Sequence, residues 1–277
     1  MSQQTDVFAG RGAHGVRPPL STAERIGSVV WYQVVVYKRT WRGTIISRFV
    51  SPLFFLLSMG IGLGSLVDAR SGGVGGVPYL QYLVPAIVAV QAMWVSIGES
   101  TYAVLGNLMW DRMYQTMLGT PLRVRDVLAG HISAVVGHIA MASVIFVAVA
   151  AAFGGFSSWG AVWCVPVAVL TGLAFTVPVF AFTATQESDS GFNILFRLVV
   201  TPLMLFSGTF FPVESLPVWL QPIAWVTPLW HGVEASRAVA LGTVDPPWLA
   251  LHLSVLVAFV VVGWVLAVRL FTRRLVK

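Results

Sequence analysis

Long apolar runs alternate with short polar segments along this chain of 277 residues. A membrane-spanning helix needs about 20 mostly apolar residues. One run contains a basic residue, Arg197, which fits a span only if it lies near an end and reaches the lipid head groups. The pattern predicts an all-α integral membrane protein with six transmembrane helices. In chain order these spans are Phe49–Leu66, Leu80–Gly98, Ile132–Phe153, Ala161–Thr185, Ile194–Phe211 and Trp248–Val268.

The first 45 residues divide into two segments of different composition. Residues 1–20 are rich in Gly, Pro, Gln and Arg and predict a disordered cytoplasmic tail, which leaves residues 21–277 as a single transmembrane domain. From Thr22 to Thr44, aromatic and basic residues mix with valines, which favours an N-terminal helix lying in the membrane interface. An extended cytoplasmic start to the first span is the alternative. No signal-peptide pattern is found, so we expect the first span to direct insertion.

Residues 107–130 form the one long polar interruption that could hold a helix outside a membrane. Methionines four residues apart lie on one stripe of a helix, and Gly119 and Pro121 are expected to end it, because glycine suits a left-handed cap and proline cannot continue the hydrogen-bond ladder. Such a helix fits the groove of a partner protein; a solvated connector is the alternative. The predicted partner-binding residues are Met109, Asp111, Arg112, Met113, Met117, Thr120, Pro121 and Arg123.

The segment from Phe211 to Pro247 is strongly apolar, yet prolines at 212, 217, 222 and 228 interrupt it too often for a continuous span. Short broken helices that dip into the outer leaflet reconcile the two facts, and they make this segment a candidate outer gate. Glu99, the acidic residue within reach of the second span, is a candidate pathway carboxylate or a paired residue at the end of a span. The predicted substrate-path residues are Glu99, Phe210, Phe211, Trp219, Trp225, Trp230 and His231.

Composition and charge support this topology. Hydrophobic residues make up 57% of the chain and charged residues only 10%, with a mean hydropathy of +0.81, which excludes an ordinary soluble protein. With the N-terminus inside, all basic residues except Arg70 and Arg237 fall on the cytoplasmic side. The net charge of +6 is therefore explained by basic residues at the cytoplasmic ends of the spans, and it does not indicate nucleic-acid binding. We expect both termini and residues 107–130 to be cytoplasmic.

The sequence offers no nucleotide or metal site of its own. A phosphate-binding loop needs a lysine after glycine, and neither Lys38 nor Lys277 follows one. If ATP drives this protein, a separate subunit must bind the ATP and magnesium. We expect this chain itself to hold no cofactor. His131 and His138 share one face of the third span but lack the further ligands that a metal needs, so we expect them to pack between helices.

Two other function classes stay open. Ser157 after Gly155-Phe156, with His252 in the last span, is similar to the pairing of six-span intramembrane serine proteases. An ion-coupled secondary transporter is the second alternative, although such carriers usually hold ionisable groups at mid-membrane.

Two motifs resemble the type-2 ABC export permeases, and most closely the nodulation-factor (lipo-oligosaccharide) and daunorubicin-resistance exporters. The first is MYQTMLGTPLRVRDVLAG at residues 113–130, which is similar to the family's cytoplasmic segment around Thr-Pro-Leu-Arg. The second is FSGTFFPVESLPVWLQPIAWVTPLWHGVEASRAVALG at residues 206–242, which is similar to the family's progression of Phe-Pro, Leu-Pro and Pro-Leu-x-His before the last span.

The resemblance implies a permease dimer, with a second copy or a sister chain, in the bacterial cytoplasmic (inner) membrane. Each chain would have an interfacial N-terminal helix, a cytoplasmic coupling helix and two external re-entrant helices. A separate ATP-binding subunit would dock on Met109–Thr120, so the chain itself is no enzyme. The implied function is ATP-driven export of an amphiphilic substrate, such as a lipid-linked or lipidated oligosaccharide or a hydrophobic drug. One departure from relatives is that Asp111 stands almost alone as an acidic residue in the coupling stretch.

Overall fold

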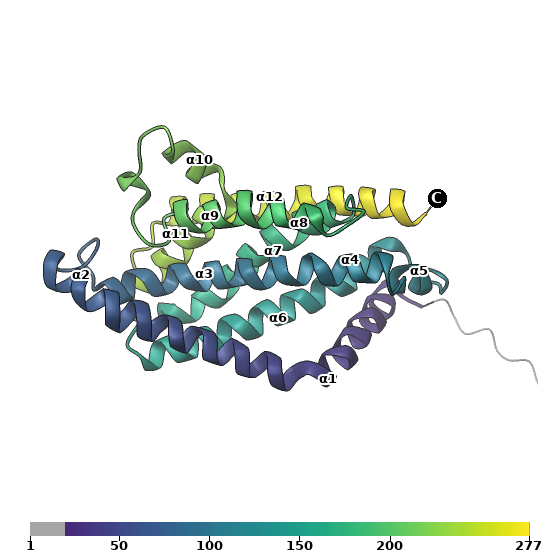
Figure 1. Ribbon diagram of the computed structural model, residues 1–277, viewed down its shortest axis with the longest axis horizontal. Coiled ribbons are helices and arrows are strands. Elements are labelled where there is room, and N and C mark those ends of the chain that lie inside the picture. The colour runs from purple at the N-terminus through teal and green to yellow at the C-terminus, as the bar shows by residue number, and fades with distance from the viewer. Residues whose placement is uncertain (1–19, 277) are drawn as a thin grey trace, which may run out of the picture.

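The computed structural model describes residues 20–276, apart from several side chains between residues 40 and 61. The predicted tail therefore lies outside the described residues, except for Leu20. The described part is a bundle of α-helices (Figure 1). The α-helices are α1 Thr22–Phe55, α2 Gly64–Ser71, α3 Tyr79–Ser100, α4 Tyr102–Met109, α5 Met113–Leu118, α6 Val124–Ala152, α7 Cys164–Thr183, α8 Ser190–Ile194, α9 Thr201–Phe206, α10 Gln221–Val226, α11 Pro228–Leu241 and α12 Pro246–Leu275.

Helices long and apolar enough to cross a membrane coincide with five of the six predicted spans. Each extends past its predicted span at one end or at both, because the helical backbone continues beyond the apolar residues. The sixth prediction, Ile194–Phe211, falls on a shorter apolar helix, Ser190–Phe206, so a sixth crossing stays a prediction. The five long segments are Leu53–Ser71, Tyr79–Met109, Val124–Ala152, Trp159–Thr183 and Pro246–Leu275.

The predicted interfacial helix and the first span form one continuous helical run. Helix α1 passes through Thr44 without a break and continues through a π-helical segment, Leu56–Leu63, into α2. Figure 1 shows a bend in α1 that separates a short first arm from a longer second arm. The first arm is thus helical and stands at an angle to the rest of α1. Its position in the membrane interface stays a prediction.

Small residues let the central helices approach closely. A Cβ added at Gly172 of α7 would stand 2.7 Å from Ile139 of α6, and one at Gly263 of α12 would stand 2.8 Å from Pro178 of α7. In addition, the Ser96 hydroxyl of α3 donates to the Gly172 carbonyl (2.8 Å). Small residues and buried hydroxyl bonds of this kind hold membrane helices together where lipid offers no hydrophobic driving force between them.

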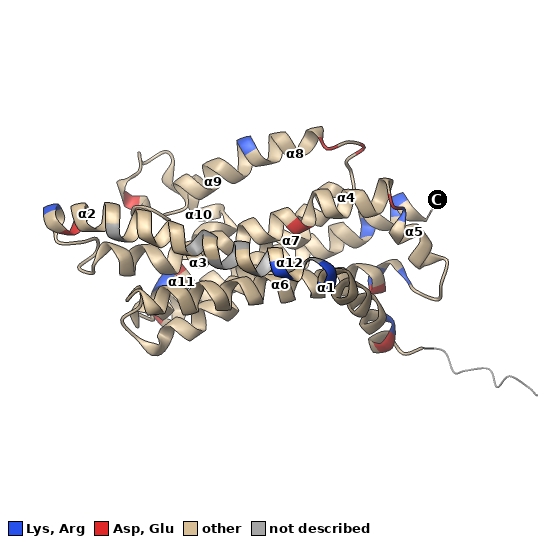
Figure 2. Ribbon diagram, turned by 60° about the horizontal axis from the view of Figure 1, so that its bottom comes forward, with Lys and Arg blue, Asp and Glu red and all other residues tan. Residues whose placement is uncertain are grey.

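The two ends of the bundle differ in character. Helix α5 and the C-terminal end of α12 lie at one end, and α2, α10 and α11 lie at the other (Figure 1). Figure 2 shows that lysines and arginines concentrate toward the end with α5, with few near α2 and α11. This distribution agrees with the expected cytoplasmic position of α5, because positive residues are retained on the cytoplasmic side.

Candidate functional site

The polar interruption at 107–130 is not one helix but spans the end of α4, all of α5 and the start of α6. Helix α4 ends at Met109, and the N–H groups of Trp110 and Asp111 both donate to the Gly106 carbonyl at 3.0 Å. Arg112 then adopts a left-handed conformation (φ 49°), which turns the chain before α5 begins at Met113. The predicted single methionine stripe is therefore wrong, because Met109 lies on a different helix from the other two.

Helix α5 ends where the sequence predicts, but by a different geometry. Gly119 follows the last helical residue, Leu118, with a right-handed backbone (φ −71°), so no left-handed cap forms. The N–H of Gly119 donates to the Gln115 and Thr116 carbonyls, and the Thr120 hydroxyl donates to the Met117 carbonyl (2.6 Å). The last turn is thus closed by hydrogen bonds to carbonyls three and four residues earlier, and Pro121 lies beyond it.

One aromatic residue, Tyr114, anchors α5 to the bundle. Its side chain is buried, and its hydroxyl forms a hydrogen bond with Nδ1 of His131 on α6 (2.6 Å). Its ring packs edge-on against Phe271 of α12 at 5.8 Å between centroids. Burial raises the pKa of Tyr114, so the hydroxyl stays protonated. Tyr114 links this short helix to two long ones.

The exposed side of α5 is polar. Met117 is partly buried against the hydrophobic core, Met113 is half-buried, and Met109 of α4 is the methionine that reaches solvent or lipid. The predicted docking residues Asp111 and Arg112 are exposed, as is Thr120. Other exposed residues of this surface are Gln115, Thr116 and Gly119. We call Asp111, Arg112, Gln115, Thr116, Gly119 and Thr120 the α5 surface.

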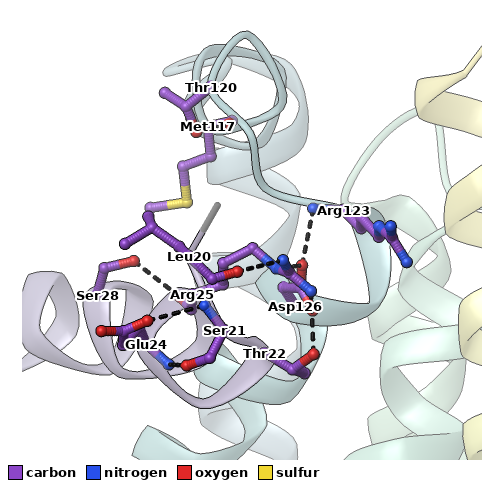
Figure 3. Close-up of polar contacts among 10 residues, drawn as sticks. All are labelled: Leu20, Ser21, Thr22, Glu24, Arg25, Ser28, Met117, Thr120, Arg123 and Asp126. Carbon is purple, nitrogen blue, oxygen red and sulfur yellow. Dashed lines mark hydrogen bonds and ion pairs between the residues drawn. The ribbon is translucent and has the colours of Figure 1, made fainter. Parts of the chain in front are cut away.

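A buried carboxylate ties the chain after α5 to the start of α1 (Figure 3). Asp126, in the first turn of α6, accepts a hydrogen bond from the backbone N–H of Arg123 (3.0 Å) and an ion-pair bond from Nε of Arg25 (2.8 Å). The Arg25 guanidinium also donates to the Leu20 carbonyl and the Thr22 hydroxyl. The side chain of Asp126 is only 5% exposed, which makes this an ion pair largely removed from water.

The first arm of α1 packs closely on α6 beside this ion pair. A Cβ at Gly130 would stand 2.5 Å from the Cβ of Val29 and 3.1 Å from the Ile26 carbonyl oxygen. Val29 is buried in this contact. The glycine therefore permits an approach between α1 and α6 that a larger residue would prevent.

Gly130→Val is expected to push α1 away from α6 and to lower the free energy of unfolding by about 1–3 kcal/mol, the usual cost of overpacking. The measurement is thermal unfolding of the purified protein in detergent. Gly137→Val is the matched control on the same helix, because no atom lies within 4 Å of an added Cβ there. Equal melting temperatures for the two variants would contradict the close contact.

Glu99 is placed by the structure beside a histidine. Its carboxylate lies 3.1 Å from Nδ1 of His138 on α6, and the His138 ring lies 4.7 Å from that of Tyr37 on α1. His131 lies seven residues, or about two helical turns, before His138 on α6. It forms a hydrogen bond with Tyr114 and packs edge-on against Phe180. The two histidines therefore lie between helices, as the sequence suggested. Glu99 lines none of the pockets considered below.

The proline-rich segment folds into short helices at the other end of the bundle. A single helical turn, Val213–Ser215, precedes α10, and α10 and α11 each have proline in the first turn, where the missing N–H has no intrahelical partner. The Thr227 hydroxyl caps α11 by accepting from the Trp230 N–H. These helices fit the predicted broken elements, and their depth in a membrane stays a prediction.

Only part of the predicted substrate-path set is brought together. Trp225, Trp230 and His231 line a cavity of about 650 Å³ between α10, α11 and the start of α12. Phe210 packs instead against the core, and Phe211 and Trp219 lie outside this cavity, with Trp219 72% exposed. We call the cavity the Trp pocket. Its lining residues are Glu214, Trp225, Trp230, His231, Glu234, Arg237, Ala238, Leu241, Thr243, Asp245, Trp248, Leu249, Leu251 and His252.

Two histidines meet at the base of the Trp pocket. Nδ1 of His231 lies 2.8 Å from Nδ1 of His252, so one ring donates a proton to the other and at least one of the two is neutral. Burial lowers the pKa of His231, in agreement with a neutral ring. The edge of Trp230 packs on both imidazoles at about 5 Å. This pair joins α11 to α12.

The serine and histidine of the protease alternative do not meet. Ser157 lines a separate pocket beside Trp159 and Val162, whereas His252 is bonded to His231. We expect Ser157→Ala to leave function unchanged, because no general base contacts this hydroxyl among the described residues. Transport by the variant checks this expectation. A complete loss of activity in a normally assembled variant would instead support the intramembrane serine protease.

Three important residues escaped prediction because their partners are distant in sequence. Tyr114 forms a hydrogen bond with His131, and Arg25 forms an ion pair with Asp126. The guanidinium of Arg237 lies 3.9 Å from the centre of the Tyr82 ring of α3. One local signal was available. Asp126 stands three residues after Arg123, the spacing at which a side chain caps the start of its own helix.

Comparison with known proteins adds independent information. A family described as "ABC-2 type transporter" matches residues 24–241. Nodulation protein J of Rhizobium leguminosarum bv. trifolii is 33% identical over 259 residues, which cover 91% of this chain and 96% of the relative. Nodulation protein J of Sinorhizobium fredii is 32% identical, covering 89% and 95%. The inner membrane transport permease YadH of Escherichia coli K12 is 22% identical, covering 86% and 90%.

Proposed function

Because this chain is a membrane-spanning permease of the ABC-2 type transporter family, we propose that it is the membrane subunit of an ATP-driven exporter. The proposed substrate is amphiphilic: a lipid-linked or lipidated oligosaccharide, or a hydrophobic drug. Similarity to the nodulation J proteins supports the first class. The protein would lie in a bacterial cytoplasmic membrane with both termini inside, and would pair with a second copy or a sister permease.

The observation that carries this proposal is the α5 surface. A helix of six residues is too short to be stable alone, yet α5 is held from beneath by Tyr114 and presents polar residues outward. It lies at the end of the bundle where basic residues concentrate (Figure 2). We propose that the separate ATP-binding subunit, which would hold ATP and magnesium, docks on this surface.

The contacts of α5 suggest how force would reach the rest of the chain. Displacement of α5 would act on α6 and α12 through Tyr114, and on α1 through the Arg25–Asp126 ion pair. Helix α12 continues without a break to His252 near its other end, where it is bonded to α11. A tilt of α12 would therefore be transmitted to the wall of the Trp pocket, which we propose as the outer gate.

Reconstitution with a candidate ATP-binding subunit tests the proposal. We expect the two proteins to purify together and to move a fluorescent amphiphile across vesicle membranes only when ATP is supplied on the side of α5. A permease that transports in the absence of any ATP-binding partner would overturn the proposal.

The Glu99–His138 contact lets the ion-coupled alternative be tested directly. For an ATP-driven exporter, Glu99→Gln is expected to retain transport within about threefold, because a neutral amide still hydrogen-bonds the imidazole. Transport should also survive collapse of the proton gradient by a protonophore. Abolition by either treatment, with ATP present, would favour ion coupling.

A further inference from the structure

The Trp pocket has the size and walls of a small-molecule site. Its volume, about 650 Å³, lies within the range of known ligand pockets. The rings of Trp225 and Trp230 stand 6.5 Å apart with their planes tilted by 51°, and Trp248 forms a further wall. Trp225 and Trp248 are 44% and 58% exposed, so their ring faces are open to a ligand.

The one arginine of the pocket is already used by the fold. Arg237 is buried, stacks on the Tyr82 ring at 3.9 Å, and donates to the Gly208 carbonyl (2.8 Å) and to the Glu234 carboxylate. These contacts join α11 to α3 and to the chain after α9. The pair with Glu234 is neutral overall, so Arg237 offers no free positive charge to an anionic ligand.

Two other acidic residues of the pocket keep their negative charge available. Glu214 and Asp245 line the cavity, and neither makes an ion pair within the part of the chain that the structure describes. Asp245 is the N-cap residue of α12, but its side chain makes no capping hydrogen bond. The pocket thus combines an uncompensated negative charge with accessible tryptophan faces, and both features attract an organic cation.

A second, apolar groove shares one lining residue with this pocket. It has a volume of about 510 Å³ and is lined by Trp163, Pro166, Val167, Leu170, Val239, Val244, Leu249 and Leu253. Leu249 of α12 lines both spaces. A polar head in the Trp pocket is therefore adjacent to a surface that suits an alkyl chain.

We propose that this composite site binds a cationic amphiphile, with an alkylammonium or quaternary ammonium head against Trp225 and Trp248, countered by Glu214 and Asp245. The alkyl chain lies along the groove past Leu249. This inference rests on the proposed function in one respect only, that the ligand is exported; binding itself needs no partner. A sugar head would also stack on tryptophan, but it would leave both carboxylates without a counter-charge.

The test uses the purified full-length permease alone in nanodiscs of zwitterionic lipid, with empty discs as background. The probes are dodecyltrimethylammonium, dodecyl maltoside and tetramethylammonium, each below any micelle concentration and followed by tryptophan fluorescence. We expect dodecyltrimethylammonium to bind at least about tenfold more tightly than either of the others. Added sodium chloride should weaken its binding.

Variants locate the site. Glu214→Gln combined with Asp245→Asn, both conservative changes at exposed positions, should weaken dodecyltrimethylammonium binding about tenfold, and Trp248→Ala should weaken it by a similar factor. Trp159→Ala is the control, since this exposed tryptophan lines neither the Trp pocket nor the groove, and should bind as the parent protein does.

The outcomes separate the two proposals. Equal binding by the double variant, or tighter binding of dodecyl maltoside, overturns the cation site even if ATP-dependent transport is found. Cation binding that depends on the two carboxylates, in a protein that transports nothing with any ATP-binding partner, overturns the exporter and leaves the site intact.

Discussion

Asp126→Ala is expected to reduce partner-driven transport by about tenfold or more and to destabilise the protein by up to about 3 kcal/mol. Its carboxylate is 5% exposed and holds Nε of Arg25 and the N–H of Arg123. Breaking a buried ion pair by removing one partner typically costs about 3–5 kcal/mol. We place this case at the low end, because Arg25 keeps the Leu20 carbonyl and the Thr22 hydroxyl as acceptors.

Thermal unfolding and transport into vesicles measure the two effects. Glu187→Ala, which removes an exposed carboxylate from the turn before α8, should change neither by a measurable amount. A double-mutant cycle with Arg25→Ala should give an interaction energy above about 1 kcal/mol. If the single effects add, the two side chains do not act together and the proposed connection from the coupling region to α1 is wrong.

Thr116→Arg is expected to abolish stimulation of the partner's ATPase activity, with a loss of tenfold or more, while the permease stays folded. Thr116 lies in the middle of the α5 surface and is exposed, so a long cationic side chain there would obstruct docking without disturbing the buried Tyr114. Met117→Asp should instead unfold the region, because Met117 packs against the core.

Thr272→Arg on α12 is the matched control. Both threonines are exposed, and each donates its hydroxyl to the carbonyl four residues earlier. The comparison therefore changes the same side chain in the same local setting on a different helix. ATPase stimulation should survive Thr272→Arg, and equal stimulation by both variants would show that α5 is not the docking surface.

The sequence predicted the long helices because their signal is local. An apolar run of about 20 residues is visible without any tertiary contact, and all five uninterrupted runs correspond to long helices. The turn at Arg112 was missed because left-handed backbone is usually signalled by glycine or asparagine, and an arginine gives no such indication. The methionine spacing therefore suggested one helix where the chain makes two.

The candidate sites were predicted only in outline, since their contacts join distant parts of the chain. Arg25 and Asp126 are 101 residues apart, and no periodicity relates them. At the other end, the proline-rich segment contributes Trp225, Trp230 and His231 to the Trp pocket, whereas Trp248 and His252 come from α12. Their part in a substrate path stays a prediction. Phe210 follows a left-handed turn at Gly208 (φ 74°) and packs against the core instead of lining the pocket.

The central claim, that α5 receives force from a separate ATP-binding subunit, is tested most directly by cross-linking from position 116. The natural cysteine, Cys164, is buried, so Thr116→Cys provides the accessible thiol for a short bifunctional reagent. We predict a cross-linked product between the permease and the co-expressed ATP-binding protein, and none from Val144→Cys on the exposed side of α6. Equal cross-linking from both positions, or none from position 116 in an actively transporting complex, would contradict the account.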